Sequence, residues 1–136
     1  MSEEASAKKT VLLVEDEHPL RALYKEILEQ AGFNVIESAD GDSALKMILR
    51  EPWDVLVLDI MLPKKDGLEV LKEARKNPKW KKGPIILLTN LNSEEIIDAA
   101  FNLGGDGYLV KSEITPDKIV DEIKSVLKNS FSVFSK

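Results

Sequence analysis

The sequence has no cysteine and only one histidine among its 136 residues. A protein without thiols forms no disulfides, holds no metal through thiolates and uses no cysteine nucleophile. The single histidine, His18, does not make a metal site by itself, and we expect it at the surface where a helix begins. A reactive site in this protein must therefore be built from carboxylates, hydroxyls and amines.

Positive charge is also scarce, because 24 acidic residues outnumber 19 basic ones and the formal net charge is -5. A protein held on DNA or RNA by phosphate contacts needs an excess of Lys and Arg, so we expect no nucleic-acid binding by this chain. No apolar stretch approaches the roughly 20 residues of a membrane span, and residues 1–9 lack the apolar core of a signal peptide. The sequence thus predicts a cytoplasmic protein with no membrane contact.

The length favours one domain, and the 43% hydrophobic content is sufficient for a packed core. Apolar runs typical of strands alternate with segments of helical period, which is the pattern of βα units around a parallel sheet. The predicted strands cover residues 11–14, 33–36, 55–59, 84–89 and 107–111, with a helix after each one. We therefore predict the α/β class, with five βα units that are wound on both faces of the sheet.

The helix boundaries follow from local signals. In the first helix, Pro19 lies at the start, an apolar stripe that includes Leu23 follows, and Gly32 ends the helix in the left-handed conformation. Asn92 is placed to cap the fourth helix. The last helix is expected to run from about residue 116 to residue 127.

Polar residues stand where several of the apolar runs end. Glu15 and Asp16 follow the first run, Asp59 ends the third, Thr89 the fourth and Lys111 the fifth. In an open parallel sheet, sites form beyond the carboxyl ends of the strands, so these side chains are expected to converge on one edge. A set of carboxylates with a hydroxyl and an ammonium suits a divalent metal and a phosphoryl group better than other chemistry.

Each of these residues also has an ordinary structural interpretation. The adjacent acids Glu15 and Asp16 would repel each other unless a cation lies between them, which favours Mg²⁺, although a solvated loop remains open. Asp59 is able to attack phosphorus and form an acyl phosphate, or it serves as a capping or loop aspartate. Lys111 either contacts a phosphate oxygen or lies on the surface. Thr89 either donates its hydroxyl to a phosphate or is an ordinary strand residue.

Ordered motifs give the chain a family resemblance. They are Val-Glu-Asp-Glu at residues 14–17, Leu-Asp-Ile-Met-Leu-Pro at 58–63 followed by Asp66-Gly67, Leu-Thr at 88–89 and Tyr-Leu-Val-Lys at 108–111. Over residues 10–127 the chain resembles the receiver domain of bacterial two-component response regulators, of the stand-alone chemotaxis type. The resemblance implies a flavodoxin-like (βα)5 fold whose parallel sheet has the strand order 2-1-3-4-5.

The resemblance also implies which residues bind metal and phosphate. By this resemblance Asp59 is the phosphoacceptor, Asp16 and Asp59 bind Mg²⁺ through their side chains, and the backbone carbonyl of Met61 supplies another ligand. Glu15 completes the acidic pocket through a metal-bound water. Lys111 contacts the phosphoryl oxygens.

A signalling mechanism is implied as well. After phosphorylation the Thr89 hydroxyl moves toward the new phosphoryl group and Tyr108 turns into the vacated space, so these two residues form a switch pair. The face made by the fourth helix, the fifth strand and the fifth helix then changes, and a partner recognises it. The expected partners are a sensor histidine kinase or histidine phosphotransfer protein and an unknown downstream protein. We expect a monomer or a phosphorylation-dependent dimer, and no enzymatic activity beyond the chain's own phosphorylation and dephosphorylation.

We expect residues 10–128 to form the receiver domain, between a flexible N-terminus at 1–9 and a C-terminal tail at 129–136. A stand-alone receiver is expected, but a phosphorylation-independent interaction module and a receiver excised from a larger DNA-binding regulator remain alternatives. Ser112 departs from the family, which commonly has a proline in a cis peptide after the lysine. A cis bond to a residue other than proline costs about 3–4 kcal/mol, so this peptide is expected to be trans or strained.

Overall fold

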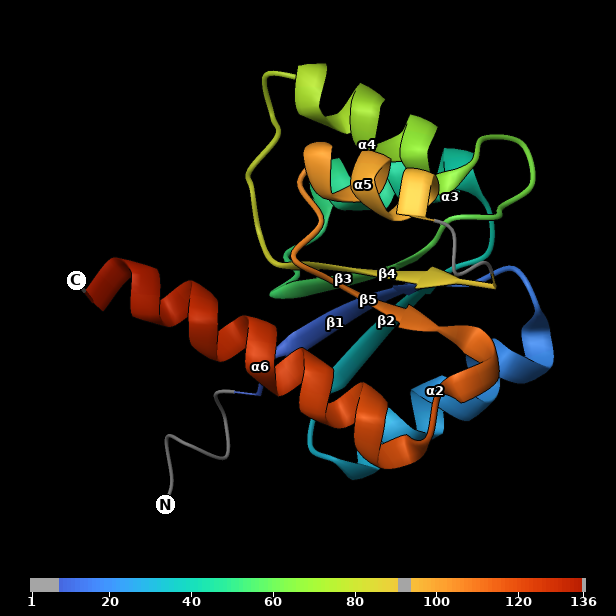
Figure 1. The fold of residues 1–136 in the computed structure, drawn as a ribbon, viewed down its shortest axis with the longest axis vertical. Coiled ribbons are helices and arrows are strands. Elements are labelled where there is room, and N and C mark those ends of the chain that lie inside the picture. The colour runs from blue at the N-terminus through green and yellow to red at the C-terminus, as the bar shows by residue number, and fades with distance from the viewer. Residues whose placement is uncertain (1–7, 91–93, 136) are drawn as a thin grey trace.

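The structure is a computed structural model that describes residues 8–90 and 94–135. Its strands are β1 (Thr10–Val14), β2 (Asn34–Ser38), β3 (Val55–Asp59), β4 (Ile85–Thr89) and β5 (Gly107–Val110). All neighbouring pairs are parallel, and the order is β2-β1-β3-β4-β5. This sheet occupies the centre of the molecule in Figure 1 and confirms the strand order 2-1-3-4-5.

Helices cover both faces of the sheet. They are α2 (His18–Gln30), α3 (Gly41–Arg50), α4 (Gly67–Lys76), α5 (Glu94–Asn102) and α6 (Pro116–Ser135). In Figure 1, α3, α4 and α5 lie on one side of the sheet, and α2 and α6 lie on the other. The predicted doubly wound α/β fold is therefore confirmed.

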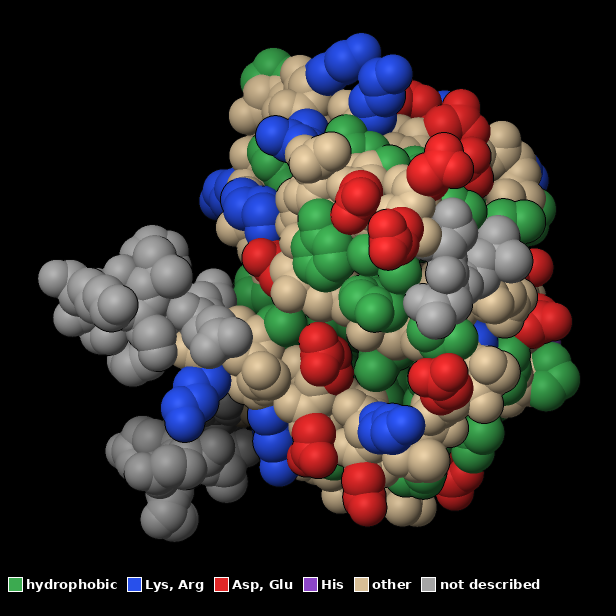
Figure 2. Space-filling model, viewed as in Figure 1, with side chains coloured by type: hydrophobic (Ala, Val, Ile, Leu, Met, Phe, Trp, Pro, Cys, Tyr) green, Lys and Arg blue, Asp and Glu red, His purple; other side chains and the backbone are tan. Residues whose placement is uncertain are grey.

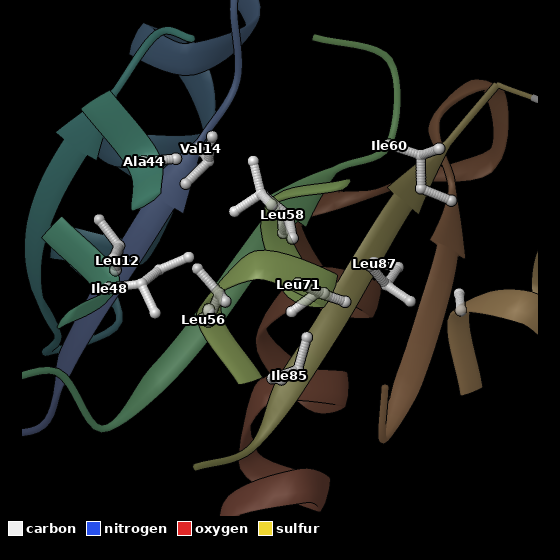
Figure 3. Close-up of a cluster of buried hydrophobic side chains, with 13 residues drawn as sticks. Leu12, Val14, Ala44, Ile48, Leu56, Leu58, Ile60, Leu71, Ile85 and Leu87 are labelled. Atoms are coloured by element: carbon white, nitrogen blue, oxygen red, sulfur yellow. The ribbon is translucent and has the colours of Figure 1, made fainter. Parts of the chain in front are cut away.

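The central strands are apolar on both faces because helices cover them on both sides. Successive residues of a strand point to opposite faces, so Leu12 and Leu56 join one core cluster while Val11 joins the other. Figure 3 shows the first cluster, in which Ile48 of α3 and Leu71 of α4 lie above the strand residues. Because each central strand is buried along its whole length, the position of its last residue at the edge of the sheet is fixed by packing.

The helix ends follow local sequence signals. Asp40 caps α3 by accepting a hydrogen bond of 2.8 Å from the Ser43 N–H. Asp66 caps α4 in a capping box with Glu69, whose N–H donates to the Asp66 side chain at 2.9 Å. Gly32 follows Ala31, the C-cap residue of α2, and adopts a φ of 98°, as predicted. An N-cap such as Asp40 or Asp66 contributes about 1 kcal/mol to stability.

Strands β1, β2, β4 and β5 differ from their predicted bounds by one or two residues. Two of these differences have a clear local cause. The Phe33 N–H donates to the Leu28 carbonyl at 3.0 Å, so Phe33 closes the end of α2 and β2 begins one residue later, at Asn34. Strand β5 ends at Val110 because Lys111 begins a short 3-10 turn, η1 (Lys111–Glu113).

The first helix buries a narrower stripe than predicted. Its buried side chains are Tyr24 and Leu28, whereas Leu23 is 49% exposed. Leu23 comes one residue before Tyr24, so at about 100° per residue its side chain points well away from the buried pair around the helix axis. His18 is exposed where α2 begins, as expected.

The chain ends bear on the predicted boundaries of the domain. Helix α6 continues past the predicted end at Leu127 to Ser135, so residues 129–135 extend the helix. Residues 1–7 and Asn92, the predicted cap of the fourth helix, lie outside the described residues. In the described part of the chain no helix combines the length and the apolar character that crossing a membrane requires.

Candidate functional site

The carboxyl ends of adjacent strands bring the predicted site residues to one edge of the sheet. Glu15 directly follows β1, Asp59 is the last residue of β3, and Thr89 is the last residue of β4. Asp59 is paired in register with Leu88, one residue before Thr89. Lys111 follows β5 at the same edge.

A buried ion-pair triad forms the centre of this edge. The Lys111 ammonium lies 2.6 Å from Asp59 Oδ2 and 2.8 Å from Glu15 Oε1. The three side chains are almost inaccessible, with 6% of Lys111, 1% of Asp59 and 0% of Glu15 exposed. Lys111 is therefore buried beside Asp59 rather than exposed at the surface, and its predicted contact with phosphoryl oxygens stays a prediction.

The remaining carboxylate oxygens of the triad have backbone partners. Glu15 Oε2 accepts a hydrogen bond from the Glu17 N–H at 3.1 Å, and Asp59 Oδ1 accepts one from the Met61 N–H at 3.0 Å. Glu15 Oε1 is buried without a well-formed hydrogen bond, although the ammonium lies close to it. The pocket thus leaves a buried acceptor that a cation would satisfy.

The pKa values of the triad show that its two carboxylates have too little positive charge near them. Burial raises the pKa of Glu15 to about 7, although Lys111 and the Glu17 N–H both favour its charged form. Burial also raises the pKa of Asp59, against hydrogen bonds from Lys111 and the Met61 N–H. Burial alone would lower the pKa of Lys111, but the two carboxylates outweigh it and that pKa lies above its usual value. A single ammonium therefore stabilises the charge of two carboxylates.

The acidic pocket, formed by Glu15, Asp16 and Asp59, has the donor set of a hard divalent cation. One carboxylate oxygen from each residue lies within 4.8 Å of the others. Asp16 is exposed whereas the other two are buried, so the pocket meets solvent on one side. Oxygen donors with room for water are what Mg²⁺ prefers in proteins. The pocket therefore fits Mg²⁺, as predicted, and the role of the Met61 carbonyl stays a prediction.

The two predicted switch residues occupy different environments. Thr89 is 1% exposed at the end of β4, next to the pocket, whereas Tyr108 of β5 is 39% exposed. The Tyr108 ring meets the Phe101 ring of α5 edge to face, with centroids 6.1 Å apart and an angle of 82° between the ring planes. Tyr108 thus points outward in this structure, and its inward movement remains a prediction.

Arg21 is a further residue of the site that no sequence motif indicated. Its Nη1 donates to the Glu15 carbonyl at 2.8 Å, and its Nε donates to Glu37 Oε1 at 3.1 Å. Lys25 also contacts Glu37, with 3.1 Å between Nζ and Oε2. Arg21 therefore connects α2, the end of β1 and β2, and it holds the main chain of an acidic-pocket residue.

The departure from the family at Ser112 does not displace the lysine. No peptide bond among residues 8–90 and 94–135 is cis, so the Lys111–Ser112 bond is trans. Lys111 still contacts both Asp59 and Glu15. A proline at this position is therefore not required to bring the ammonium to the pocket.

Curated proteins that are similar to the chain include transcriptional regulatory proteins. The chain is 40% identical over 120 residues to the transcriptional regulatory protein CpxR of Escherichia coli strain K12, across 88% of this chain and 50% of CpxR. It is 36% identical over 121 residues to the phosphate regulon transcriptional regulatory protein PhoB of the same strain, across 88% of this chain and 52% of PhoB. The chain thus spans about half the length of the curated relatives it matches.

Solved structures are similar over nearly the whole chain. A CheY-like receiver domain protein from Methanospirillum hungatei matches with a TM-score of 0.84 and 28% identity, over 93% of this chain and 98% of that one. The receiver domain of the sensor histidine kinase PA1611 from Pseudomonas aeruginosa, with a magnesium ion in its active-site cleft, matches with a TM-score of 0.80 and 25% identity. That match covers 90% of this chain and 99% of the other.

The family model of the response regulator receiver domain matches residues 11–124. This range contains every strand residue from Val11 onward and every residue of the triad. The match covers most of the chain and agrees with the structural neighbours, so the chain belongs to the response regulator receiver domains of two-component systems.

Proposed function

We propose that this chain is a phosphorylation-activated switch that accepts a phosphoryl group on Asp59 from a histidine kinase or a histidine phosphotransfer protein. The observation that carries the proposal is the buried contact of 2.6 Å between Asp59 and Lys111, inside a pocket whose other acids are Glu15 and Asp16. A capping or loop role for Asp59 would not explain why a buried ammonium and two further acids lie beside it. The complete set also argues against a phosphorylation-independent interaction module.

The residues of the chain have separable roles in the transfer. The Asp59 carboxylate attacks the phosphorus of a phosphohistidine, the P–N bond breaks, and the imidazole leaves with the electron pair and takes up a proton. Lys111 exchanges its contacts with Asp59 and Glu15 for the incoming phosphoryl oxygens, whose charge it stabilises. Glu15, Asp16 and Asp59 would hold Mg²⁺, which supplies further charge stabilisation to the same oxygens. The chain acts on no other substrate in this proposal.

The signal leaves the site through Thr89 and Tyr108. The Thr89 hydroxyl turns toward the phosphoryl group, and Tyr108 moves from its outward position into the space beside it. This movement ends the edge contact between Tyr108 and Phe101 and changes the surface that α5, β5 and α6 present. The output is contact with another protein, by population shift between two packings. The cytoplasmic location expected from the sequence stays a prediction.

A second candidate concerns the larger protein rather than the site. The chain covers only 50% of CpxR and 52% of PhoB, which are transcriptional regulators by name. This supports the alternative in which the chain is the receiver of a transcriptional regulator and the same switch controls a DNA-binding part. The chemistry at Asp59 is identical in both candidates, so the phosphorylation experiment tests the step that they share.

The test is intact mass after incubation with Mg²⁺ and acetyl phosphate. The native protein is expected to gain a single phosphoryl group, because Asp59 lies beside a cation and a metal pocket. Asp59→Asn is expected to gain none, since an amide is not a competent nucleophile. Asp54→Asn, which changes an aspartate that precedes β3, is the matched control and should behave as the native protein does. A phosphoryl group on Asp59→Asn, or none on the native protein even with a phosphohistidine donor, would contradict the proposal.

Arg21 is expected to control metal affinity without touching the metal. Arg21→Ala removes the hydrogen bond to the Glu15 carbonyl and should weaken Mg²⁺ binding about tenfold, the lower end of the usual effect of residues that orient metal ligands. Lys25→Ala is the matched control, because Lys25 contacts the same Glu37 but not Glu15. The measurement is the Mg²⁺ dissociation constant by titration calorimetry. Equal affinities for the two variants would rule out the positioning role of Arg21.

A further inference from the structure

A basic hollow lies at the amino ends of β3 and β4, on the edge of the sheet opposite to the acidic pocket. Trp53 and Gly83, which each precede one of these strands by two residues, both line it. At about 3.3 Å per strand residue, Trp53 lies roughly 20 Å from Asp59 along the direction of β3. The hollow has a volume of about 340 Å³, which is within the range of small-molecule sites. It is therefore separate from the site of the proposed phosphoryl transfer.

One wall of the basic hollow is the indole ring of Trp53, which is held at both ends. Its Nε1 donates to the Ile48 carbonyl near the end of α3 at 3.0 Å. Its opposite edge lies against Gly83, where an added Cβ would be 2.7 Å from Trp53 Cζ3 and 3.0 Å from Cη2. The ring is half-buried, and it packs against the first core cluster. A fixed and partly exposed indole offers a flat surface on which a planar ring stacks.

Cations surround this ring. Basic side chains around the hollow outnumber acidic ones by four to one, with Glu51 as the acid. The basic side chains are Arg50, Lys79, Lys81 and Lys82. Lys82 is already paired, since its ammonium lies 2.8 Å from Asp106 Oδ2. Among the ion pairs of the described residues, none includes Arg50, Lys79 or Lys81, and all three are exposed. An anion in the hollow would therefore meet three cations with no acidic partner of their own.

This excess of positive charge is local in a chain whose net charge is -5. In Figure 2, many of the Lys and Arg side chains stand at the top and upper left, where Figure 1 places the end of α4 and the loop that leads to β4. Acidic side chains predominate over the rest of that face. A small anion is attracted by the hollow alone, whereas an extended polyanion would also meet the surrounding acids. The charge distribution thus favours a small ligand over a nucleic acid or a long acidic peptide.

From the ring, the cations and the volume together we infer that the basic hollow binds a free nucleoside diphosphate or triphosphate. The base stacks on Trp53. The phosphates meet Arg50, Lys79 and Lys81, which supply a guanidinium fork and two mobile ammonium groups. A nucleotide joins a planar ring to several phosphates in one small molecule, and the hollow offers contacts for both parts. The inference goes beyond the proposed function and does not depend on phosphorylation of Asp59.

The test is titration calorimetry of the unphosphorylated protein with ADP, without a divalent cation, so that the acidic pocket repels the nucleotide. The native protein is expected to show saturable binding at one site. Trp53→Leu should weaken this binding about tenfold, because the base loses its stacking surface. Trp80→Leu is the matched control, since Trp80 also packs against the first core cluster but does not line the hollow. Its affinity for ADP should stay within about twofold of native.

Charge reversals test the same site without touching the core. Lys79→Glu with Lys81→Glu reverses two exposed cations of the hollow and should weaken ADP binding at least about tenfold. Lys124→Glu with Lys128→Glu changes two exposed lysines of α6 and gives the same net charge. This control should stay within about twofold of the native affinity, because interactions between distant exposed charges are screened by salt.

Four outcomes would overturn the proposal. The first is that the native protein does not bind ADP. The second is that pyrophosphate binds as tightly as ADP, which would mean that the hollow takes an anion without recognising a base. The third is equal weakening by the two double reversals, which would show general attraction. The fourth is tighter binding of a single-stranded oligonucleotide or a polyglutamate peptide, which would assign the hollow to a macromolecule. Because no arm uses Mg²⁺ or a phosphoryl donor, failure here is distinguishable from failure of phosphorylation on Asp59, which the mass experiment detects alone.

Discussion

Replacing Lys111 with methionine is expected to lower the free energy of unfolding by about 3–5 kcal/mol when no divalent cation is present, because a buried ion pair loses one partner. The variant keeps most of the apolar stem but removes the ammonium, so Asp59 and Glu15 face each other with 1% and 0% of their side chains exposed. Urea unfolding of both proteins at about pH 8 measures the difference, since at that pH the Glu15 carboxyl, with its pKa of about 7, is charged in the native protein.

The sign of the pH dependence follows from the same groups. A carboxyl whose pKa is raised by folding stabilises the protein below its unfolded pKa, and this contribution is lost as the pH rises through the folded pKa. Lys111→Met raises the pKa of Glu15 further, so the variant should recover part of its stability between about pH 8 and about pH 5.

Two additional variants separate this electrostatic effect from loss of packing. Adding Glu15→Gln to Lys111→Met removes one of the two facing charges, and the double variant should be more stable than Lys111→Met alone. Lys124→Met on α6 is the surface control and should change stability by less than about 0.5 kcal/mol. Millimolar Mg²⁺ should stabilise Lys111→Met more than native protein, because the ion replaces a missing positive charge. A loss that neither Mg²⁺ nor Glu15→Gln reduces would mean that the ammonium is not what balances the acids.

The convergence of the site was predictable because it depends on features that are local in sequence. Apolar runs end at Glu15, Asp59 and Thr89, and parallel strands place their carboxyl ends at one edge whatever the details of packing. Lys111 was predicted in the same way and reaches the pocket even though β5 ends one residue earlier and Ser112 replaces the usual proline. A long side chain tolerates such small shifts of its backbone.

The residues that sequence reasoning missed depend on contacts between distant elements. In the sequence, nothing distinguishes Arg21 from the other charged residues of α2. Only the three-dimensional course of β1 and β2 brings Glu15 and Glu37 to it. The contact of Phe101 with Tyr108 likewise joins α5 to β5 across a turn, and it depends on the side-chain conformation of Tyr108. Neither contact leaves a periodicity or a motif in the chain.

Gly67→Ala is expected to destabilise the protein by about 3 kcal/mol, at the upper end of the cost of overpacking, and to slow phosphorylation of Asp59. Gly67 is the buried first residue of α4, and its N–H donates to the Ile60 carbonyl at 2.8 Å. A Cβ added at Gly67 would lie 2.5 Å from the Asp59 carbonyl oxygen and 2.9 Å from Ile60 Cα. Both neighbours are backbone atoms that cannot rotate away, so α4 or the end of β3 must move.

Gly32→Ala is the matched control for this substitution, because it separates backbone strain from collision. No atom lies within 4 Å of a Cβ added there, but the φ of 98° is unfavourable for alanine and should cost about 1 kcal/mol. Gly32 lies after α2 rather than at the acidic pocket, so its variant should accept phosphate from acetyl phosphate at the native rate. Urea unfolding and the rate of mass gain measure the two effects. Equal stability losses and native rates for both variants would mean that α4 is not packed rigidly on the phosphoacceptor strand.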